Sequence, residues 1–130
     1  MANYYASAKT NSFQVNNVDD FENELEKFDD LEVISNKETS MVTIYSNSET
    51  GFVWDYFDEE LDDYVEVDWQ AIFQKHLADG WVAIIQEVGN EKLRYLGGLA
   101  VAFNNKGETI DININNIFEL AKSIGKHVEH

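Results

Sequence analysis

The chain has 130 residues and a formal net charge of −16 at pH 7, with 44% apolar residues and no Cys or Pro. This apolar content is too high for an acidic disordered chain and suffices for one domain with a core. The lack of Cys excludes disulfides, thiolate zinc sites and a cysteine nucleophile, and the negative charge argues against direct binding to nucleic acid or to an anionic membrane. Because no segment is typical of a signal peptide or a membrane span, we expect a cytoplasmic protein.

A short strand, a helix and a β-hairpin are predicted in the first 46 residues. The strand is expected at residues 11–16, and the helix at residues 18–28 with Asn17 as its N-cap. Residues 31–35 and 41–46 read as two strands joined by a polar turn. The helix should bury the apolar residues that recur at helical spacing on one side, which are Val18, Phe21, Leu25 and Phe28.

An acidic segment at about residues 55–68 follows, and a second helix is expected directly after it. Asp68 is the predicted N-cap of this helix, and Gly80 is the predicted residue just past its end. The apolar side of the helix should be formed by Trp69, Ile72, Phe73 and Leu77.

Three strands are predicted next, at about residues 81–88, 93–103 and 108–114, joined by hairpin connections at residues 89–92 and 104–107. The middle strand has two unlike faces. Larger side chains line one face, namely Leu93, Tyr95, Leu99, Val101 and Phe103. Small ones line the other face, namely Gly98, Ala100 and Ala102, where we expect a helix to approach closely.

The last helix should start near Asn116, with Glu119 completing a capping box, and end at Gly125. Its buried side is predicted to consist of Ile117, Leu120, Ala121 and Ile124. Consecutive strands joined by short turns predict an α+β fold. We therefore expect a single domain over residues 1–130, in which three helices pack against an antiparallel sheet of about five to six strands.

The negative charge is concentrated in two windows, residues 19–32 and residues 55–68. Together they hold 16 acids and 1 base, a net charge of −15, whereas the other 102 residues hold 9 acids and 8 bases. A run of charge is usually a solvated face that maintains solubility, and this reading stays open. Concentrated like charge destabilises a compact state, however, and solubility alone is better served by mixed charge.

Carboxylates in these windows could be spaced like the phosphates of DNA. Side chains repeat at about 4.5–6 Å along one side of a helix and at about 6.6 Å along one face of a strand. Duplex DNA carries one charge per about 1.7 Å of axis, spread over two strands. Such rows could occupy the Lys- and Arg-lined groove of a DNA-binding protein, with fast and salt-dependent binding.

The predicted contact residues form two rows and a pair of aromatic anchors. The main row consists of Asp55, Asp58, Glu59, Glu60, Asp62, Asp63 and Glu66. The second row consists of Asp19, Glu22, Glu26, Asp29 and Asp30. The candidate anchors are Trp54, directly before the second window, and Tyr56 within it.

Motifs for metal, cofactor or catalytic chemistry are not found in the sequence. An EF-hand loop started at Asp58 would have Asp63 where Gly is needed and Trp69 where Glu is needed. We expect no cofactor and no dedicated metal site, although a weak Ca²⁺ or Mg²⁺ site stays open. The acids crowd in runs, whereas acid–base catalysis needs carboxyls isolated in different environments. His76 and the two terminal histidines match no triad, so we expect a protein that is not an enzyme.

Both ends of the chain resemble a set of small acidic proteins carried by bacterial phages and mobile elements. The similarity lies in the opening "NYYASAKTNSFQV" before an acidic helix, and in "EKLRYLGGLAVAFNNKGE" in the C-terminal half. In that set the two stretches bracket a variable acidic middle. The resemblance provides no catalytic or binding residues, but it implies a context. Small acidic phage proteins often inhibit host defence, as anti-CRISPR and anti-restriction proteins that mimic DNA do.

These observations predict a non-enzymatic inhibitor that acts in the cytoplasm of the bacterial host cell. Its acidic surface would block the nucleic-acid-binding site of a defence nuclease, either a CRISPR effector or a restriction enzyme. The expected partner is a basic nucleic-acid-binding protein, not nucleic acid itself or a membrane, and a dimer remains possible. Two alternatives stay open: an immunity or antitoxin protein that neutralises a basic toxin, and a cation-binding module.

Overall fold

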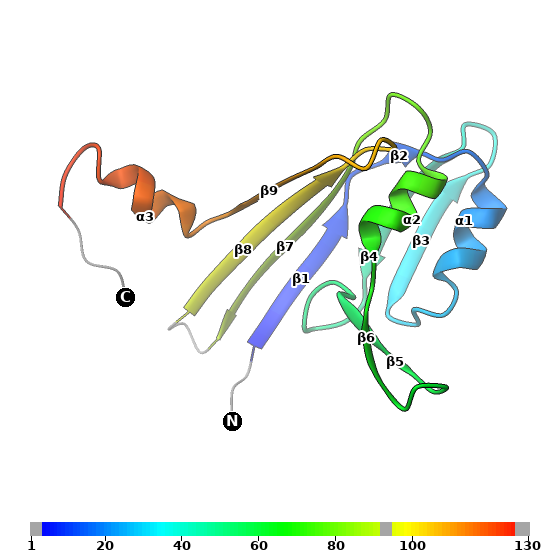
Figure 1. The fold of residues 1–130 in the computed structure, drawn as a ribbon, viewed down its shortest axis with the longest axis horizontal. Helices are drawn as coiled ribbons and strands as arrows, with labels where there is room; N and C mark the ends of the chain where they lie inside the picture. Colours follow the sequence, from blue (N-terminus) through cyan, green and yellow to red (C-terminus); the bar gives the residue numbers. More distant parts are fainter. Residues whose placement is uncertain (1–3, 92–94, 127–130) are drawn as a thin grey trace.

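The computed structural model describes residues 4–91 and 95–126, which form one α+β domain built on a twisted seven-stranded sheet (Figure 1). The strand order is β2-β4-β1-β7-β8-β9, with β3 also paired to β4, and every pair of these strands is antiparallel. The strands are β1 (Tyr4–Thr10), β2 (Phe13–Gln14), β3 (Leu31–Asn36), β4 (Met41–Ser46), β7 (Ala83–Glu91), β8 (Tyr95–Phe103) and β9 (Thr109–Asn113).

The antiparallel sheet and its helices confirm the predicted fold class. The sheet is larger than expected because β1, which was not predicted, lies in its centre between β4 and β7. β1 alternates exposed residues with small buried ones, Ala6 and Ala8. An apolar pattern made of alanines is weak in a sequence, yet a strand with neighbours on both sides needs no large side chains to be buried.

Helices α1 (Val18–Leu25) and α2 (Trp69–His76) start where the sequence predicts. The Asn17 side chain accepts a hydrogen bond from the Asp20 backbone N–H at 2.9 Å, and the Asp68 side chain accepts one from the Ala71 N–H at 3.0 Å. α1 ends three residues earlier than expected, but Phe28 is still buried beyond its end. Capping by Asn and Asp supplies acceptors for N–H groups that the first helical turn leaves unpaired.

The core lies between one face of the sheet and the two helices, and aromatic rings fill it. Phe73 of α2 is fully buried, and its ring centroid lies 5.5 Å from that of Phe13 on β2, 5.7 Å from Trp69 and 5.1 Å from Phe103 on β8. Phe13 also contacts the Phe21 ring of α1 edge-on at 5.8 Å. These contacts hold both helices against the sheet through one continuous cluster.

Three local predictions in the second half of the chain are wrong. Helix α2 is followed by an extended C-cap at Leu77, so Gly80, with a positive φ of 84°, lies in the next turn and not directly at the helix end. Residues Gly89–Glu91 of the expected hairpin connection belong to β7, while Leu93 lies outside the described residues. The helices cover the Val101 and Phe103 face of β8, not the face of small residues.

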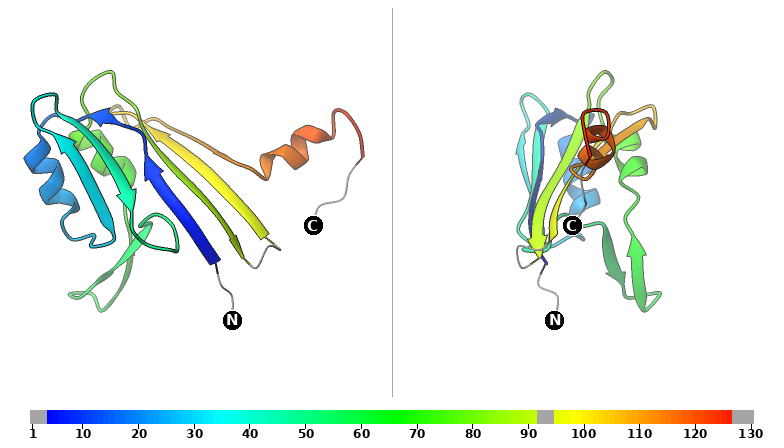
Figure 2. Two further views of the ribbon diagram at one scale, coloured as in Figure 1. Left: turned by 180° about the vertical axis from the view of Figure 1, so that it is seen from behind. Right: turned by 90° about the vertical axis from the view of Figure 1, so that its left-hand side faces the viewer.

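In the described ranges, no helix covers the other face of the sheet, which Figure 2 shows from behind (left view). Val88 on β7 and Ile110 and Ile112 on β9 are 60%, 73% and 64% exposed there. These residues share one face because strand pairing places Val88 opposite Gly98, Ala100 opposite Ile112 and Ala102 opposite Ile110. The small residues of β8 therefore lie within an exposed apolar face.

Helix α3 (Asn116–Ala121) does not pack as expected, because it extends beyond the end of β9 and has no buried residue (Figure 1). Ile117, Leu120 and Ile124 are 58%, 67% and 91% exposed, and Ala121 is only partly buried. The expected capping box is also absent, since the cap residue Asn115 makes no side-chain cap hydrogen bond. The predicted buried side of this helix is thus an exposed apolar stripe.

Candidate functional site

The acidic window at residues 55–68 folds as a β-hairpin that extends from the domain. Its strands β5 (Asp55–Asp58) and β6 (Asp63–Glu66) pair antiparallel in a sheet of their own, separate from the large one. The connecting loop spans residues 59–62, and the Asp58 side chain accepts the Glu60 N–H at 2.9 Å. Asp62 has a positive φ of 51°, a conformation that Asp tolerates better than most residues.

The hairpin places like charges directly opposite each other. Asp55 pairs with Glu66, and Asp58 pairs with Asp63. Cross-strand pairs of like charge are destabilising, by roughly 0.2–1 kcal/mol each. The hairpin must therefore be stabilised by other contacts, which lie at its base and between its aromatic side chains.

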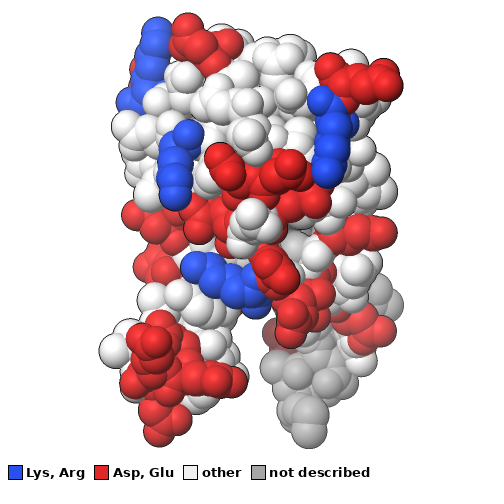
Figure 3. Space-filling view, turned by 90° about the vertical axis from the view of Figure 1, so that its right-hand side faces the viewer, with Lys and Arg blue, Asp and Glu red and all other residues white. Residues whose placement is uncertain are grey.

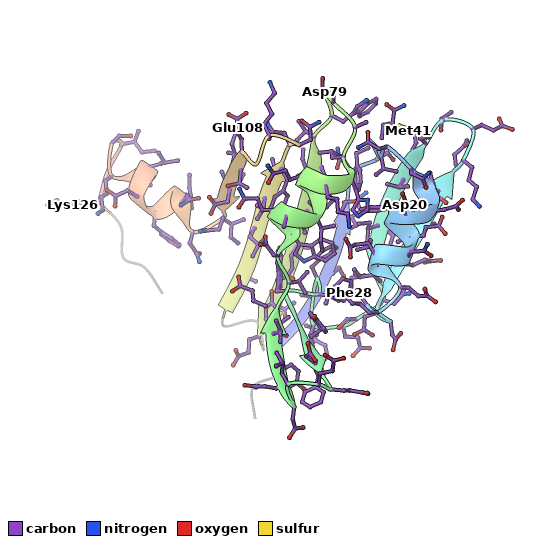
Figure 4. The ribbon with its side chains drawn as sticks, turned by 45° about the vertical axis from the view of Figure 1, so that its right-hand side comes forward. Asp20, Phe28, Met41, Asp79, Glu108 and Lys126 are labelled. Carbon is purple, nitrogen blue, oxygen red and sulfur yellow. The ribbon has the colours of Figure 1, made fainter. Side chains whose placement is uncertain are left out.

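At its base the hairpin packs on the end of the first acidic window (Figure 4). The Tyr56 ring lies edge-on to the Phe28 ring, with centroids 5.4 Å apart. The Nζ of Lys27 lies 5.2 Å from the Phe28 centroid and 5.1 Å from that of Tyr56, so the one base of the acidic windows bridges the two rings. Val67 N–H also donates to the Trp54 carbonyl at 2.8 Å, which closes the base of the hairpin.

Glu87 on β7 fixes the segment that leads into the hairpin. Its side chain is buried, and its Oε1 accepts the Phe52 backbone N–H at 2.7 Å and the Trp54 indole Nε1–H at 3.0 Å. Its Oε2 accepts the Tyr4 hydroxyl at 3.1 Å. Gly51 lies against this carboxyl group so closely that a Cβ would overlap it. A carboxyl group in the sheet thus positions the start of the hairpin.

The predicted aromatic anchors, Trp54 and Tyr56, are partly buried and take part in this packing. The aromatic residues that the hairpin exposes are instead Phe57 and Tyr64, at 47% and 68%. Their rings pack edge-on, 5.4 Å apart. Strand alternation determines this difference: Tyr56 packs on Phe28, so Phe57, one residue further on, lies on the other, more exposed face of the hairpin. Unless the hairpin pairing is known, the amino-acid pattern offers no reason to prefer one aromatic residue over its neighbour.

The acids of the first window do not form one continuous helical row. Asp19 is paired with Lys37 of the β3–β4 turn at 3.0 Å, and Glu22 accepts a hydrogen bond from the Ser35 hydroxyl at 2.7 Å. Glu26 is the C-cap of α1. Asp29 and Asp30 lie beyond the helix and line the groove at the hairpin base. Two of the five predicted residues therefore have partners within the domain.

The two acidic windows nevertheless meet on one side of the molecule. A groove of about 620 Å³ lies between them, with Asp29 and Asp30 on one side and Asp55, Phe57 and Tyr64 on the other. Figure 3 shows Asp and Glu side chains gathered over this side, with a dense group on the hairpin at the lower left. Lys or Arg side chains also lie on this side, above the acidic groups and directly above the hairpin.

The C-terminal half of the fold carries no net charge. Residues 1–80 hold 19 acids and 4 bases, whereas residues 81–126 hold 5 acids and 5 bases. In Figure 4, Asp20 on α1 and Lys126 beyond α3 lie at opposite ends of the molecule. The acidic surface therefore belongs to one end of the domain.

His76, the last residue of α2, bridges the two helices. Its Nε2 lies 3.2 Å from Oε1 of Glu24 on α1, and its buried ring packs on Phe21 at 5.5 Å. The hydrogen bond to His76 lowers the pKa of Glu24 below its ordinary value, and Lys75, 3.5 Å away, acts in the same direction. This pair explains a buried histidine without invoking catalysis.

Among the residues that the structure describes, no three His, Asp or Glu side chains are arranged to hold a metal ion. Over the same residues, no helix has the length and apolar character needed to span a membrane. Comparison with protein-family models, with curated proteins and with solved structures gives no significant match to this chain.

Proposed function

We propose that the protein is a non-enzymatic inhibitor whose acidic surface takes the place of nucleic acid on a basic protein. The partner would be a bacterial defence nuclease, either a CRISPR effector or a restriction enzyme. The observation that supports this best is the β5–β6 hairpin, whose residues 55–66 include seven carboxylates and no base. The hairpin extends from the domain at the end where Asp29 and Asp30 add further negative charge.

The charge density of the hairpin is comparable to that of nucleic acid. Twelve residues folded in half span roughly 20 Å at about 3.3 Å per residue, which gives one charge per about 3 Å. A single DNA strand carries one charge per about 3.4 Å, and a duplex one per about 1.7 Å. Charge repulsion within the hairpin is the cost of this arrangement, and a cationic groove would relieve it.

The exposed Phe57 and Tyr64 give the acidic surface a means of specific contact. Charged residues at an interface mainly speed association and select partners, whereas buried aromatic residues supply much of the affinity. The Phe57–Tyr64 pair lies on the same hairpin face as Asp55 and Glu66, because residues two apart on a strand share a face. A partner groove with Lys or Arg side chains at its rim, and an apolar or aromatic site inside, would fit this face.

The fixed base of the hairpin favours binding, since a surface that is ordered beforehand loses little conformational entropy on association. Glu87 holds the segment before β5 through the Phe52 N–H, and Phe28 and Lys27 contact the Tyr56 ring on β5. The β5–β6 hairpin therefore differs from a disordered acidic tail and from a loosely attached loop.

The proposal is tested by competition. Each member of a panel of CRISPR effectors, restriction enzymes and toxic nucleases is mixed with fluorescently labelled DNA, and the purified protein is titrated in at low and at high salt. We expect the protein to displace DNA from at least one enzyme at low salt, with affinity that falls steeply as salt rises. If DNA stays bound to every enzyme at micromolar protein and low salt, the proposal is wrong.

Charge-reversal variants identify the surface that acts. Glu59, Glu60 and Glu66 are the best positions, because Asp58 and Asp62 shape the loop through a turn hydrogen bond and a positive φ. The variant with all three changed to Lys should lose displacement of DNA while keeping the wild-type circular dichroism spectrum. Undiminished displacement by the folded variant would show that another surface binds the enzyme.

A further inference from the structure

The exposed apolar surface of the C-terminal half has a consequence that is separate from the acidic hairpin. We propose that two copies of this chain form a closed dimer by exchanging α3, so that the helix of each copy covers the exposed sheet face of the other. Both surfaces are apolar, and in the part of the chain that the structure describes their aliphatic side chains are about half or more exposed.

The first surface is the stripe on α3. Ile117, Leu120 and Ile124 recur at helical spacing, and backbone hydrogen bonds from Ser123 to Leu120 and from Ile124 to Ala121 continue the winding past the helix end. All three apolar side chains are more than half exposed. A short helix draws most of its stability from tertiary packing, and within the described ranges no residue of α3 is buried.

The second surface is the sheet face opposite the core. Val88, Leu96, Ile110, Ile112 and Ile114 are all about half or more exposed on it, at 60%, 60%, 73%, 64% and 49%. A groove of about 720 Å³ lies on it, lined by Val88, Leu96 and Ile114 and also by polar residues that include Ser7, Asn90 and Glu49. The Ile114 side chain covers Gly98, where an added Cβ would meet its Cγ2 at 2.9 Å. Ala100 and Ala102, opposite Ile112 and Ile110, are the small residues that let a helix come close to the sheet.

A single chain does not bring these two surfaces together. The stretch between β9 and α3 is Ile114 and Asn115, and Ile114 is still tied to the sheet by its backbone N–H, which donates to the Gly98 carbonyl at 2.8 Å. With so short a connection, α3 extends past the sheet edge rather than turning back over the face (Figure 2). Because β9 is the last strand of the sheet, no further strand of this sheet lies beside α3 where it extends past the edge. A second copy can therefore place its own sheet face against the helix.

Electrostatics favour contact at this end of the molecule. Two chains that each carry −16 repel one another, but the charge of residues 81–126 sums to zero. The acidic hairpins stay remote from an interface made by β7, β8, β9 and α3. The exposed residues that form the two surfaces are mainly aliphatic, which favours an apolar partner over a basic one.

The area is sufficient for a stable dimer. The eight exposed aliphatic side chains of the two surfaces amount to about five fully exposed ones, and a buried aliphatic side chain removes roughly 100 Å² of apolar area from water. A pair of chains would thus bury about 1,000 Å² of apolar area, which corresponds to about 1,600 Å² in total when about two thirds of an interface is apolar. Stable interfaces typically bury about 1,200–2,000 Å². An exchange related by a two-fold axis also closes the assembly at two copies.

The test is the mass of the full chain in solution, measured by light scattering and sedimentation at moderate salt over a range of concentrations. Wild type should have twice the chain mass of 14.9 kDa. The variants Ile112→Glu and Leu120→Glu, both at exposed positions, should be folded monomers, with dissociation constants raised at least about tenfold by a charge buried without a partner. Ile34→Glu is the matched control: Ile34 is 53% exposed on β3, at the far edge of the sheet, and its variant should remain a dimer.

Mixing the two monomeric variants separates exchange from other arrangements. In an exchanged pair, the intact helix of Ile112→Glu meets the intact sheet of Leu120→Glu, so the mixture should form heterodimers although neither variant pairs with itself. Helix-to-helix and sheet-to-sheet packing predicts the opposite, with the mixture weaker than either variant alone.

A wild-type chain that is monomeric at 100 μM and moderate salt overturns the proposal, as does a dimer that both variants leave intact. Should Glu prevent folding at either position, Ile112→Thr and Leu120→Gln give the same comparison with milder changes. Loss of the dimer has no bearing on DNA competition by the hairpin, so failure here is distinguishable from failure of the proposed inhibitor function.

Discussion

The buried carboxyl group of Glu87 should be essential to the stability of the acidic hairpin. Replacement by Ala removes the acceptor of three donors: the Phe52 N–H, the Trp54 indole N–H and the Tyr4 hydroxyl. The Phe52 donor is buried, and a buried donor without a partner costs about 1–3 kcal/mol. Trp54 and Tyr4 are partly exposed, so water can replace some of the loss, at about 0.5–1 kcal/mol each.

We therefore expect Glu87→Ala to lower the free energy of unfolding by about 3 kcal/mol, a large part of the 5–15 kcal/mol typical of a domain. Urea unfolding followed by tryptophan fluorescence measures this change. Glu87→Gln keeps an acceptor oxygen for Phe52 and should lose much less. Glu38→Ala, at an exposed acid of the β3–β4 turn, is the control and should stay within about 0.5 kcal/mol of wild type.

Hydrogen exchange shows where the effect of Glu87→Ala lies. If the carboxyl group fixes the hairpin, amide protection should fall first over residues 52–66 and remain in the rest of the sheet. A loss of stability under about 1 kcal/mol, together with unchanged protection over residues 52–66, would refute the reasoning.

Further predictions concern the backbone, the core and pH. Gly51→Ala should destabilise the protein by about 2–4 kcal/mol in urea unfolding, since the position has a φ of 107° and its Cβ would overlap a buried carboxyl group. Phe73→Ala should cost about 3–5 kcal/mol and the matched exposed Phe57→Ala no more than about 1.5 kcal/mol; similar losses at both positions would contradict the assignment of the core. Because the pKa of Glu24 is lowered in the folded state, its contact with His76 stabilises above the unfolded-state pKa and is lost as pH falls through the folded-state pKa. Wild type should thus lose more stability than Glu24→Gln as pH falls from 6 to 3, and parallel pH profiles would argue against this coupling.

Patterns of large apolar residues and capping side chains were enough to predict much of the fold. Asn17 and Asp68 mark the two helix starts, and the alternation in residues 31–46 marks the β3–β4 hairpin. Strand β1 was missed because Ala6 and Ala8 form its buried side, and alanine is common in every kind of structure. The β5–β6 hairpin was missed because its acids obscure the alternation of its aromatic residues.

Of the candidate site, the sequence predicted the acidic residues but not which aromatic residues are exposed beside them. Sequence identified the acids but not the register that exposes Phe57 and Tyr64 and buries part of Trp54 and Tyr56. Glu87 did leave a signal, since it is an acid at an inward position of a strongly apolar strand and needed a buried partner. The prediction that α3 has a buried side rested on the regular helical spacing of its apolar residues. It is wrong for one chain, whose own sheet the helix does not reach.

The central claim is that the carboxylates of the hairpin, rather than net charge, compete with nucleic acid. The most direct measurement compares two triple variants of equal charge for displacement of DNA from the target nuclease: Glu59, Glu60 and Glu66 changed to Gln, and Glu38, Glu49 and Glu108 changed to Gln. With about 0.5–1 kcal/mol per contacted carboxylate, the hairpin variant should bind about 10–150-fold more weakly than wild type. The second variant should bind like wild type. Equal weakening in both variants would contradict the claim, because it would mean that overall charge alone attracts the partner.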